Sequence, residues 1–260
     1  MNSFFLYTLH LSRLISSSAI IVLIIFLIPV THTSALESTF SIIQKQELEK
    51  LIEQFLHKNP EVIVKAIKLM QERQSRQDAA RSIEALKKNK QELMTDQDAP
   101  VIGNPNGKIT IVEFFDYRCG YCKRAFTVMM KVLKENPNIR YVFKELPILG
   151  PDSIKATRAS LAIWRTQKTK YLTFHSALMK ARGAITETKI LRIANEIGID
   201  IVQLKKDMAD PKIDQILEKN YRLAQALNIT GTPAFIIGDK IIPGALDEKT
   251  MKKMISAADG

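Results

Sequence analysis

The sequence predicts an α/β domain that follows an all-helical segment, and three features lead to this prediction. A continuous apolar run at residues 109–115 has the character of a buried central strand, and two cysteines open the helix that follows it. A second strand is expected at residues 140–146 and a β-hairpin at residues 234–242, separated by a helical stretch at about residues 151–227. Residues 99–260 are therefore expected to form a strand–helix–strand half, a helical insertion and a hairpin–helix half.

Residues 1–35 have the pattern of a signal peptide. Arg13 precedes an apolar run at residues 14–30, and small residues follow it at positions 33–35. We expect cleavage after about Ala35. A retained membrane anchor is the alternative, since the apolar run is near the lower length limit for spanning a bilayer. Both forms place the rest of the chain in the periplasm or in another location outside the cytoplasm.

Residues 36–98 are predicted to be helical, with an apolar stripe along the first two helices. Asn59 and Pro60 end the first helix and are expected to start the second, with Asn59 as its N-cap. The stripe disappears over residues 71–82, a polar and helical spacer. Two short helices cannot bury such a stripe alone, so we expect a homo-oligomer, a dimer or trimer. Packing of the stripe on the domain at residues 99–260 is the alternative.

Composition excludes several classes of protein. The chain is 46% hydrophobic and 25% charged, which is typical of a globular protein. Its net charge of +11 comes from scattered lysines and arginines without a dense basic run, so we expect no nucleic-acid partner. The four histidines show no ligand spacing and the chain has only two cysteines, so neither a metal site nor an external cofactor is predicted.

Cys119 and Cys122 are separated only by Gly120 and Tyr121. A disulfide across so short a loop stabilises a fold very little, so redox chemistry explains the pair better than a structural role. The N-terminus of the following helix stabilises a thiolate on Cys119 through its dipole and its free N–H groups. We predict that Cys119 is the nucleophile and that Cys122 resolves the mixed disulfide, while Gly120 and Tyr121 tune the sulfur and contact the substrate.

Two further positions are candidates for the same site. Glu113 is the only charged residue in the predicted central strand, and a buried carboxylate there can accept the proton of the second cysteine. A glutamate facing water is the alternative, and Lys144 is either its partner or a surface lysine. Pro233 begins the last buried strand, and a cis bond before it would expose the Thr232 backbone to a substrate strand beside the first cysteine. An ordinary trans turn is the alternative.

Three motifs resemble the DsbA-type thioredoxin family: FFDYRCGYCK at residues 114–123, KELPI at residues 144–148 and GTPAF at residues 231–235. The helical leader with NPEV at residues 59–62 is similar to the ScsC-like branch, whose members oligomerise through that segment. The resemblance implies a thioredoxin fold with an inserted helical domain, a cis-Pro233, substrate proteins with thiols or disulfides, and a membrane redox partner of DsbB or DsbD type. The Gly-Tyr dipeptide and the threonine before the proline resemble the disulfide isomerase DsbC instead of typical DsbA.

Three functions are candidates. The leading one is an exported thiol–disulfide oxidoreductase that isomerises disulfides, forms them, or does both, because several active sites around a shared space can rearrange wrong disulfides. The second is a dedicated dithiol oxidase. The third is a non-catalytic surface protein or a copper(I)-binding protein that uses the paired thiolates. The presence of Glu113, both cysteines and Pro233 together argues against the third function.

Overall fold

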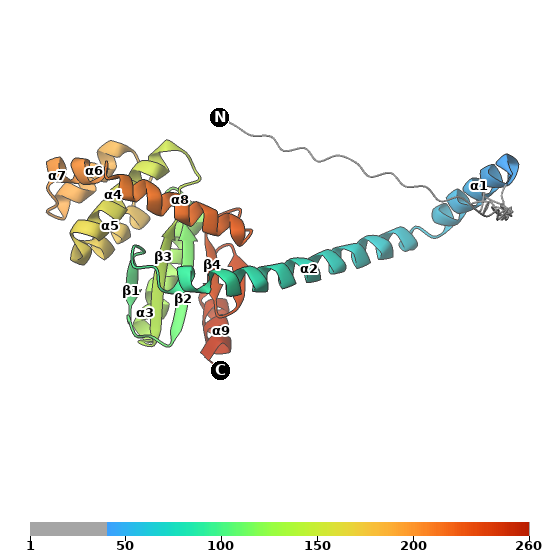
Figure 1. Ribbon diagram of the computed structural model, residues 1–260, viewed down its shortest axis with the longest axis horizontal. Coiled ribbons are helices and arrows are strands. Elements are labelled where there is room, and N and C mark those ends of the chain that lie inside the picture. Colours follow the sequence, from blue (N-terminus) through green and yellow to red (C-terminus); the bar gives the residue numbers. More distant parts are fainter. Residues whose placement is uncertain (1–40, 260) are drawn as a thin grey trace, which may run out of the picture. The chain divides into compact units, whose positions relative to one another are not determined.

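The computed structural model describes residues 41–259 (Figure 1). The signal peptide predicted for residues 1–35 lies outside the described residues. The chain divides into two compact units, of which the first ends at Ile63 and the second begins at Val64. Within residues 41–259, no helix has both the length and the apolar character that crossing a membrane requires.

The leader, residues 36–98, contains α1 (Ile42–Lys58) and α2 (Glu61–Met94). The polar spacer at residues 71–82 is therefore helical and forms the middle of α2. A capping box at Ser41 begins α1. Asn59 is the C-cap of α1, and its side-chain amide donates to the Phe55 carbonyl at 2.8 Å. The prediction that Asn59 is the N-cap of the second helix, with Pro60 as its first residue, is wrong, because α2 begins at Glu61 and Pro60 directly precedes it.

The sheet has five strands in the order β1-β3-β2-β4-β5, with β2 and β3 parallel and the other pairs antiparallel. The strands are β1 (Val101–Gly103), β2 (Ile109–Phe115), β3 (Ile139–Glu145), β4 (Ala234–Ile237) and β5 (Lys240–Pro243). The structure confirms the four strands that the sequence predicts. The prediction omitted β1, since a strand of three residues is too short to show a hydrophobic period.

The remaining helices are arranged in two groups. The helix that follows the cysteines is α3 (Gly120–Glu135), and α9 (Glu248–Asp259) ends the described chain. The insertion contains α4 (Pro151–Thr166), α5 (Lys168–Lys180), α6 (Glu187–Glu196), α7 (Ile201–Asp207) and α8 (Pro211–Ala226). Glycine or proline lies at three of the four breaks between these helices, at Gly183, Gly198 and Pro211, whereas the break at Gln167 has neither residue type nearby.

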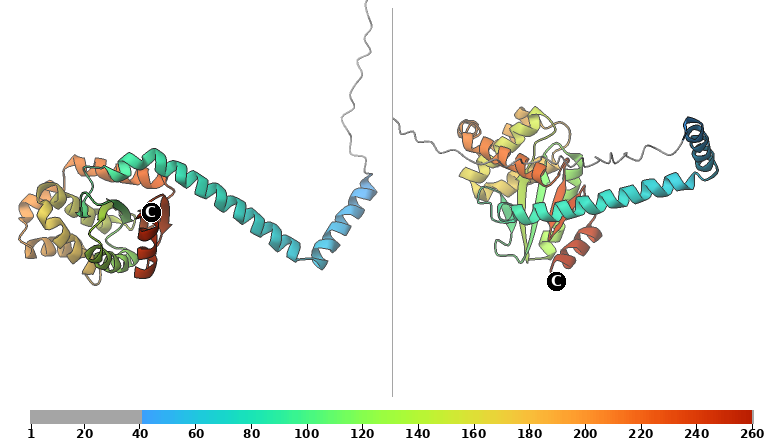
Figure 2. Two further views of the ribbon diagram at one scale, coloured as in Figure 1. Left: turned by 90° about the horizontal axis from the view of Figure 1, so that it is seen from below. Right: turned by 45° about the vertical axis from the view of Figure 1, so that its right-hand side comes forward.

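Both faces of the sheet are covered (Figure 2). Alternate residues of β2 point to opposite sides, so that Phe115 packs against the layer of α3 and α9 and Phe114 packs against α8 and the end of α2. Leu86 and Leu93 of α2 are 7% and 0% exposed and belong to the second of these cores. The last turns of α2 are therefore part of the second unit, which carries both cysteines and is called the catalytic unit below.

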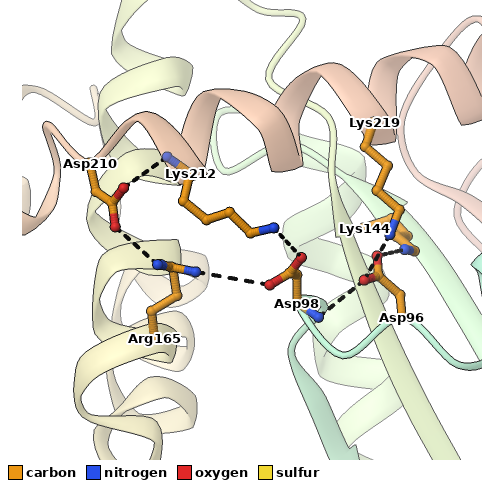
Figure 3. Close-up of polar contacts among 7 residues, drawn as sticks. All are labelled: Asp96, Asp98, Lys144, Arg165, Asp210, Lys212 and Lys219. Carbon is orange, nitrogen blue, oxygen red and sulfur yellow. Dashed lines mark hydrogen bonds and ion pairs between the residues drawn. The ribbon is translucent and has the colours of Figure 1, made fainter.

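A network of ion pairs fastens the segment after α2 to the sheet and to the insertion (Figure 3). The Asp96 carboxylate binds Lys144 of β3 and lies 3.0 Å from Nζ of Lys219 on α8. Asp98 pairs with Lys212 of α8 at 3.1 Å and with Arg165 of α4 at 3.9 Å. These contacts join elements that are distant in the sequence around the start of the catalytic unit.

Neither expectation for Lys144 is correct. Its side chain is fully buried, so it is not a surface lysine, and its partner is Asp96, not Glu113. The strand register gives the reason. Glu113 lies opposite Phe143, and Lys144 lies opposite Phe114, so the glutamate and the lysine point to opposite faces of the sheet.

Candidate active site

The two cysteines lie where β2 ends and α3 begins. Cys119 is the N-cap of α3, and its sulfur accepts a hydrogen bond from the backbone N–H of Cys122 at 3.4 Å. When Cys119 is protonated, its thiol also donates to the carbonyl oxygen of Thr232 at 3.1 Å. Cys119 is 7% exposed and Cys122 is fully buried, and both are free thiols. The first sulfur is thus the more accessible one.

The environment separates the acidities of the two thiols. Hydrogen bonding from the Cys122 thiol, supported by the backbone N–H groups of Cys122 and Tyr121, lowers the pKa of Cys119 to about 5. Burial raises the pKa of Cys122 well above its usual value, and the hydrogen bond to Cys119 and the charge of Glu113 raise it further. At neutral pH, Cys119 is therefore a thiolate while Cys122 keeps its proton.

We expect iodoacetamide to modify Cys119 first when the reduced protein is treated at mildly acidic pH. About one pH unit above its pKa, roughly 90% of Cys119 is thiolate, whereas Cys122 remains protonated. Peptide mass mapping after short reaction times identifies the labelled residue. In a Cys119→Ser control the labelling should become slow, and fast labelling of Cys122 in the parent protein would overturn the assignment of the nucleophile.

Glu113 is buried beside this pair. Its side chain is 2% exposed, and its Oε2 accepts a hydrogen bond from the Tyr141 hydroxyl at 2.8 Å, so it does not face water. Burial raises the pKa of Glu113 to about 8 against the opposing effect of the Tyr141 bond. Sequence reasoning missed Tyr141, although the alternation of Tyr141 and Phe143 in β3 places both on the face that carries Glu113.

The Thr232–Pro233 peptide bond is cis, as expected, and Pro233 directly precedes β4. This loop brings the Thr232 carbonyl to the Cys119 sulfur from the other half of the sheet. A cavity of about 290 Å³ borders the loop, and its lining includes Thr232, Pro233 and Ser82 of α2. The structure thus brings together Cys119, Cys122, Thr232 and Pro233.

Tyr121 and Gly120 occupy the first turn of α3. The Tyr121 side chain is 60% exposed, and the Arg124 guanidinium lies 4.1 Å from the centre of its ring, within the range of a cation–π contact. A Cβ at Gly120 would meet no other atom within 4 Å. Both positions are thus open to an approaching polypeptide. Within residues 41–259, histidine, cysteine and acidic side chains do not gather in threes around a point that would suit a metal ion.

Comparison with known proteins agrees with this site. Residues 110–256 match the DSBA-like thioredoxin domain. A thioredoxin-like oxidoreductase from Silicibacter pomeroyi is 42% identical, with a TM-score of 0.63, over 66% of this chain and 98% of that one. ScsC from Proteus mirabilis in a transitional conformation is 29% identical, with a TM-score of 0.63, over 84% of this chain and 98% of that one. Disulfide bond formation protein D of Bacillus subtilis is 24% identical over 60% of this chain and 75% of its own length.

Other curated relatives are much longer. The chain covers 24% of the Na(+)/H(+) antiporter NhaA 1 of Salinispora arenicola, with 22% identity over 158 residues, 61% of this chain. That match concerns one portion of the antiporter. The match to the DSBA-like model, by contrast, spans more than half of this chain and includes both cysteines, Glu113 and Pro233. The chain therefore belongs to the DSBA-like thioredoxin domain family, a family of thiol–disulfide oxidoreductases.

Proposed function

We propose that this chain is an exported thiol–disulfide oxidoreductase that isomerises disulfides, forms them, or does both, in proteins of the periplasm. The observation that carries the proposal is the difference in acidity between the two thiols, which makes Cys119 a thiolate and keeps Cys122 protonated. A thiolate at a helix N-terminus beside a buried thiol is the arrangement that disulfide exchange requires.

The exchange begins when the Cys119 thiolate attacks a substrate disulfide. One substrate sulfur leaves as a thiolate, and a mixed disulfide forms between Cys119 and the other. In isomerisation, a different substrate thiolate attacks this mixed disulfide, so that a new substrate disulfide forms and Cys119 is released as a thiolate. In net reduction, Cys122 loses its proton to Glu113 and attacks Cys119, which gives the Cys119–Cys122 disulfide and a reduced substrate. Dithiol oxidation is the reverse of that sequence.

Substrate binding is proposed to involve the cis-proline loop and the first turn of α3. The Thr232 backbone beside Cys119 can pair with an extended substrate strand, and the cavity along the loop can accept a substrate side chain. The exposed Tyr121 ring and the open position at Gly120 complete this contact surface. Substrates are proteins with thiols or disulfides, and no external cofactor takes part. A membrane protein of DsbB or DsbD type is the proposed redox partner.

The exposed apolar residues of the leader favour an isomerase. Each large apolar residue of the stripe in α1 and early α2 is about 45–65% exposed, except Leu56, which is partly buried. The exposed ones are Leu48, Leu51, Ile52, Phe55, Ile63, Ile67 and Met70. Mutual burial of these residues would hold several copies together, with their active sites around one substrate.

A dedicated dithiol oxidase is the second candidate, and trapping the cysteines in cells decides between the two. Acid quenching followed by alkylation with a thiol reagent of high mass separates the dithiol from the disulfide on a gel. A mainly reduced Cys119–Cys122 pair is expected for an isomerase, and a mainly oxidised pair would identify an oxidase. A purified protein that neither reduces, oxidises nor rearranges a model disulfide substrate would refute both candidates and leave a copper(I)-binding role.

We expect Glu113→Gln to slow the resolution of mixed disulfides by about 100-fold near neutral pH, because the variant has no group that accepts the Cys122 proton. In the parent protein the rate should rise with pH through about 8, where Glu113 ionises, and this rise should be absent in the variant. Single-turnover decay of a mixed disulfide between Cys119 and a peptide measures the rate across the pH range.

Glu145→Gln is the matched control for this experiment. Glu145 is also fully buried on the sheet, and burial raises its pKa to about 8, but it faces Thr157 and Ser160, and Glu113 is the carboxylate among the main causes of the raised pKa of Cys122. The control should resolve mixed disulfides at the rate of the parent protein. Equal rates for Glu113→Gln and the parent would remove Glu113 from the mechanism.

A further inference from the structure

We propose that Tyr117 is a positioning residue for Cys119: its buried hydroxyl, held by Ser160 and His175 of the helical insertion, fixes the loop that presents the Cys119 sulfur to the N-terminus of α3. The inference rests on the proposed exchange function and adds to it a role for the insertion. Tyr117 lies two residues before Cys119, in the connection between β2 and α3.

The Tyr117 hydroxyl has two partners, both from the insertion. It lies 2.6 Å from Oγ of Ser160 on α4 and 2.8 Å from Nδ1 of His175 on α5. All three side chains are fully buried. A buried hydroxyl without a hydrogen-bond partner is destabilising, so two partners from two helices strongly favour one orientation of the tyrosine.

The surroundings of His175 hold its ring in place and keep it uncharged. Its ring packs against the rings of Phe115, Phe126 and Phe143, with centroid distances of 5.1, 5.3 and 4.4 Å. Burial lowers the pKa of His175 to about 3, so that the imidazole is neutral at physiological pH. Phe126 belongs to α3, and His175 therefore contacts both the connection before Cys119 and the helix after it.

The residues on either side of Tyr117 are also fixed to the insertion or to the loop that leads into it. The buried Asp116 carboxylate accepts hydrogen bonds from the backbone N–H groups of Arg118 and Leu149, at 2.7 and 3.0 Å, and from the Ser153 hydroxyl at 2.8 Å. The Arg118 guanidinium donates to the Leu149 carbonyl. Each residue from Asp116 to Arg118 thus has a hydrogen-bond partner outside its own loop.

This rigidity bears directly on the acidity of Cys119. The Cys119 backbone N–H donates to the Asp116 carbonyl at 3.1 Å, so the loop and the cysteine move together. Stabilisation of the thiolate depends on short distances from the sulfur to the N–H groups of Tyr121 and Cys122, and it weakens quickly as these distances grow. A loop that can shift should therefore leave Cys119 less acidic and the protein a weaker oxidant, since a stabilised thiolate favours the reduced form.

The test is Tyr117→Phe, which keeps the ring and removes the hydroxyl. We expect the pKa of Cys119, titrated through the ultraviolet absorbance of the thiolate, to rise by about one unit. The equilibrium with glutathione should shift towards the disulfide form by about tenfold, in step with the pKa. Ser160→Ala removes one partner and should shift both quantities in the same direction by less, and it replaces the first variant if Tyr117→Phe does not fold.

Thr166→Val is the control, since Thr166 lies on the same helix as Ser160, and its hydroxyl donates to the Ala162 carbonyl of that helix and not to the loop before Cys119. It should leave the pKa of Cys119 unchanged. If Tyr117→Phe lowers the melting temperature but not the acidity of Cys119, the hydroxyl is only structural and the inference fails. The titration needs no substrate, so an acidic Cys119 in a protein without exchange activity would refute the proposed function alone.

Discussion

Replacing Asp96 with alanine is expected to lower the free energy of unfolding by about 3–5 kcal/mol. The Asp96 carboxylate is the anion that compensates Lys144, whose side chain is fully buried, and it also binds Lys219 (Figure 3). Burial lowers the pKa of Lys144, and the bond to Asp96 opposes that effect. Without Asp96, the lysine is either a buried uncompensated charge or must lose its proton, and both states cost free energy.

Urea unfolding at neutral pH measures this loss, with Asp98→Ala as the matched control. Asp98 lies in the same segment as Asp96 and also has two cationic partners, but its side chain is 29% exposed. Its replacement should therefore lower the free energy of unfolding by about 1 kcal/mol or less. The double variant Asp96→Leu with Lys144→Met removes both charges and should recover most of the stability. Equal losses for Asp96→Ala and Asp98→Ala would show that burial of the pair is unimportant.

The pH dependence gives a second signature of this pair. Burial opposes the charge of Asp96, but the hydrogen bond and charge of Lys144 hold the pKa of Asp96 below its usual value. A lowered carboxyl pKa adds stability above the unfolded-state value near 4, and this stability is lost as pH falls through the folded-state value. Below about pH 4, the free energy of unfolding of the parent protein should therefore fall more steeply than that of the double variant, which lacks this carboxylate.

The residues proposed for catalysis stand out in the sequence because their signals are local. Cys119 and Cys122 lie on one short segment between a strand and a helix, and the position alone gives the reason for an acidic thiol. Glu113 is the only charged residue in an apolar run, which marks it without knowledge of its neighbours. Pro233 precedes a buried strand, where its lack of an N–H group limits the possible structures.

The contacts that sequence reasoning missed are non-local. Asp96 and Lys144 are 48 residues apart, and Tyr117 is 58 residues from His175. Hydrophobic periodicity in the sequence reveals neither pair, because each contact depends on which helix covers which face of the sheet. Lys144 shows the problem well. The sequence suggests Glu113, on the adjacent predicted strand, as the partner of Lys144. In the observed register, Lys144 lies opposite Phe114 and one position beyond Glu113, so its side chain points to the other face of the sheet.

Deletion of residues 36–75 is expected to convert an oligomer into a folded monomer that oxidises dithiols but has lost most isomerase activity. The deletion removes the exposed apolar residues of α1 and early α2, and it keeps Leu86 and Leu93, which belong to the core of the catalytic unit. Burial of this apolar surface between copies contributes about 25 cal/mol per Å², several kcal/mol in total. Oxidation needs one Cys119–Cys122 pair, whereas rearrangement benefits from several pairs around one substrate.

Light scattering on both proteins, with refolding of a scrambled substrate and oxidation of a dithiol peptide, tests each part of this expectation. Phe55→Glu in the full-length chain places a charge on the apolar stripe and should dissociate the oligomer as the deletion does, because Phe55 is 54% exposed in the single chain. Lys50→Glu, another exposed position on α1, is the control and should leave the oligomer intact. A monomeric parent protein would refute self-association. If the truncated monomer isomerises as well as an oligomeric parent, the leader serves another purpose, such as docking to a partner.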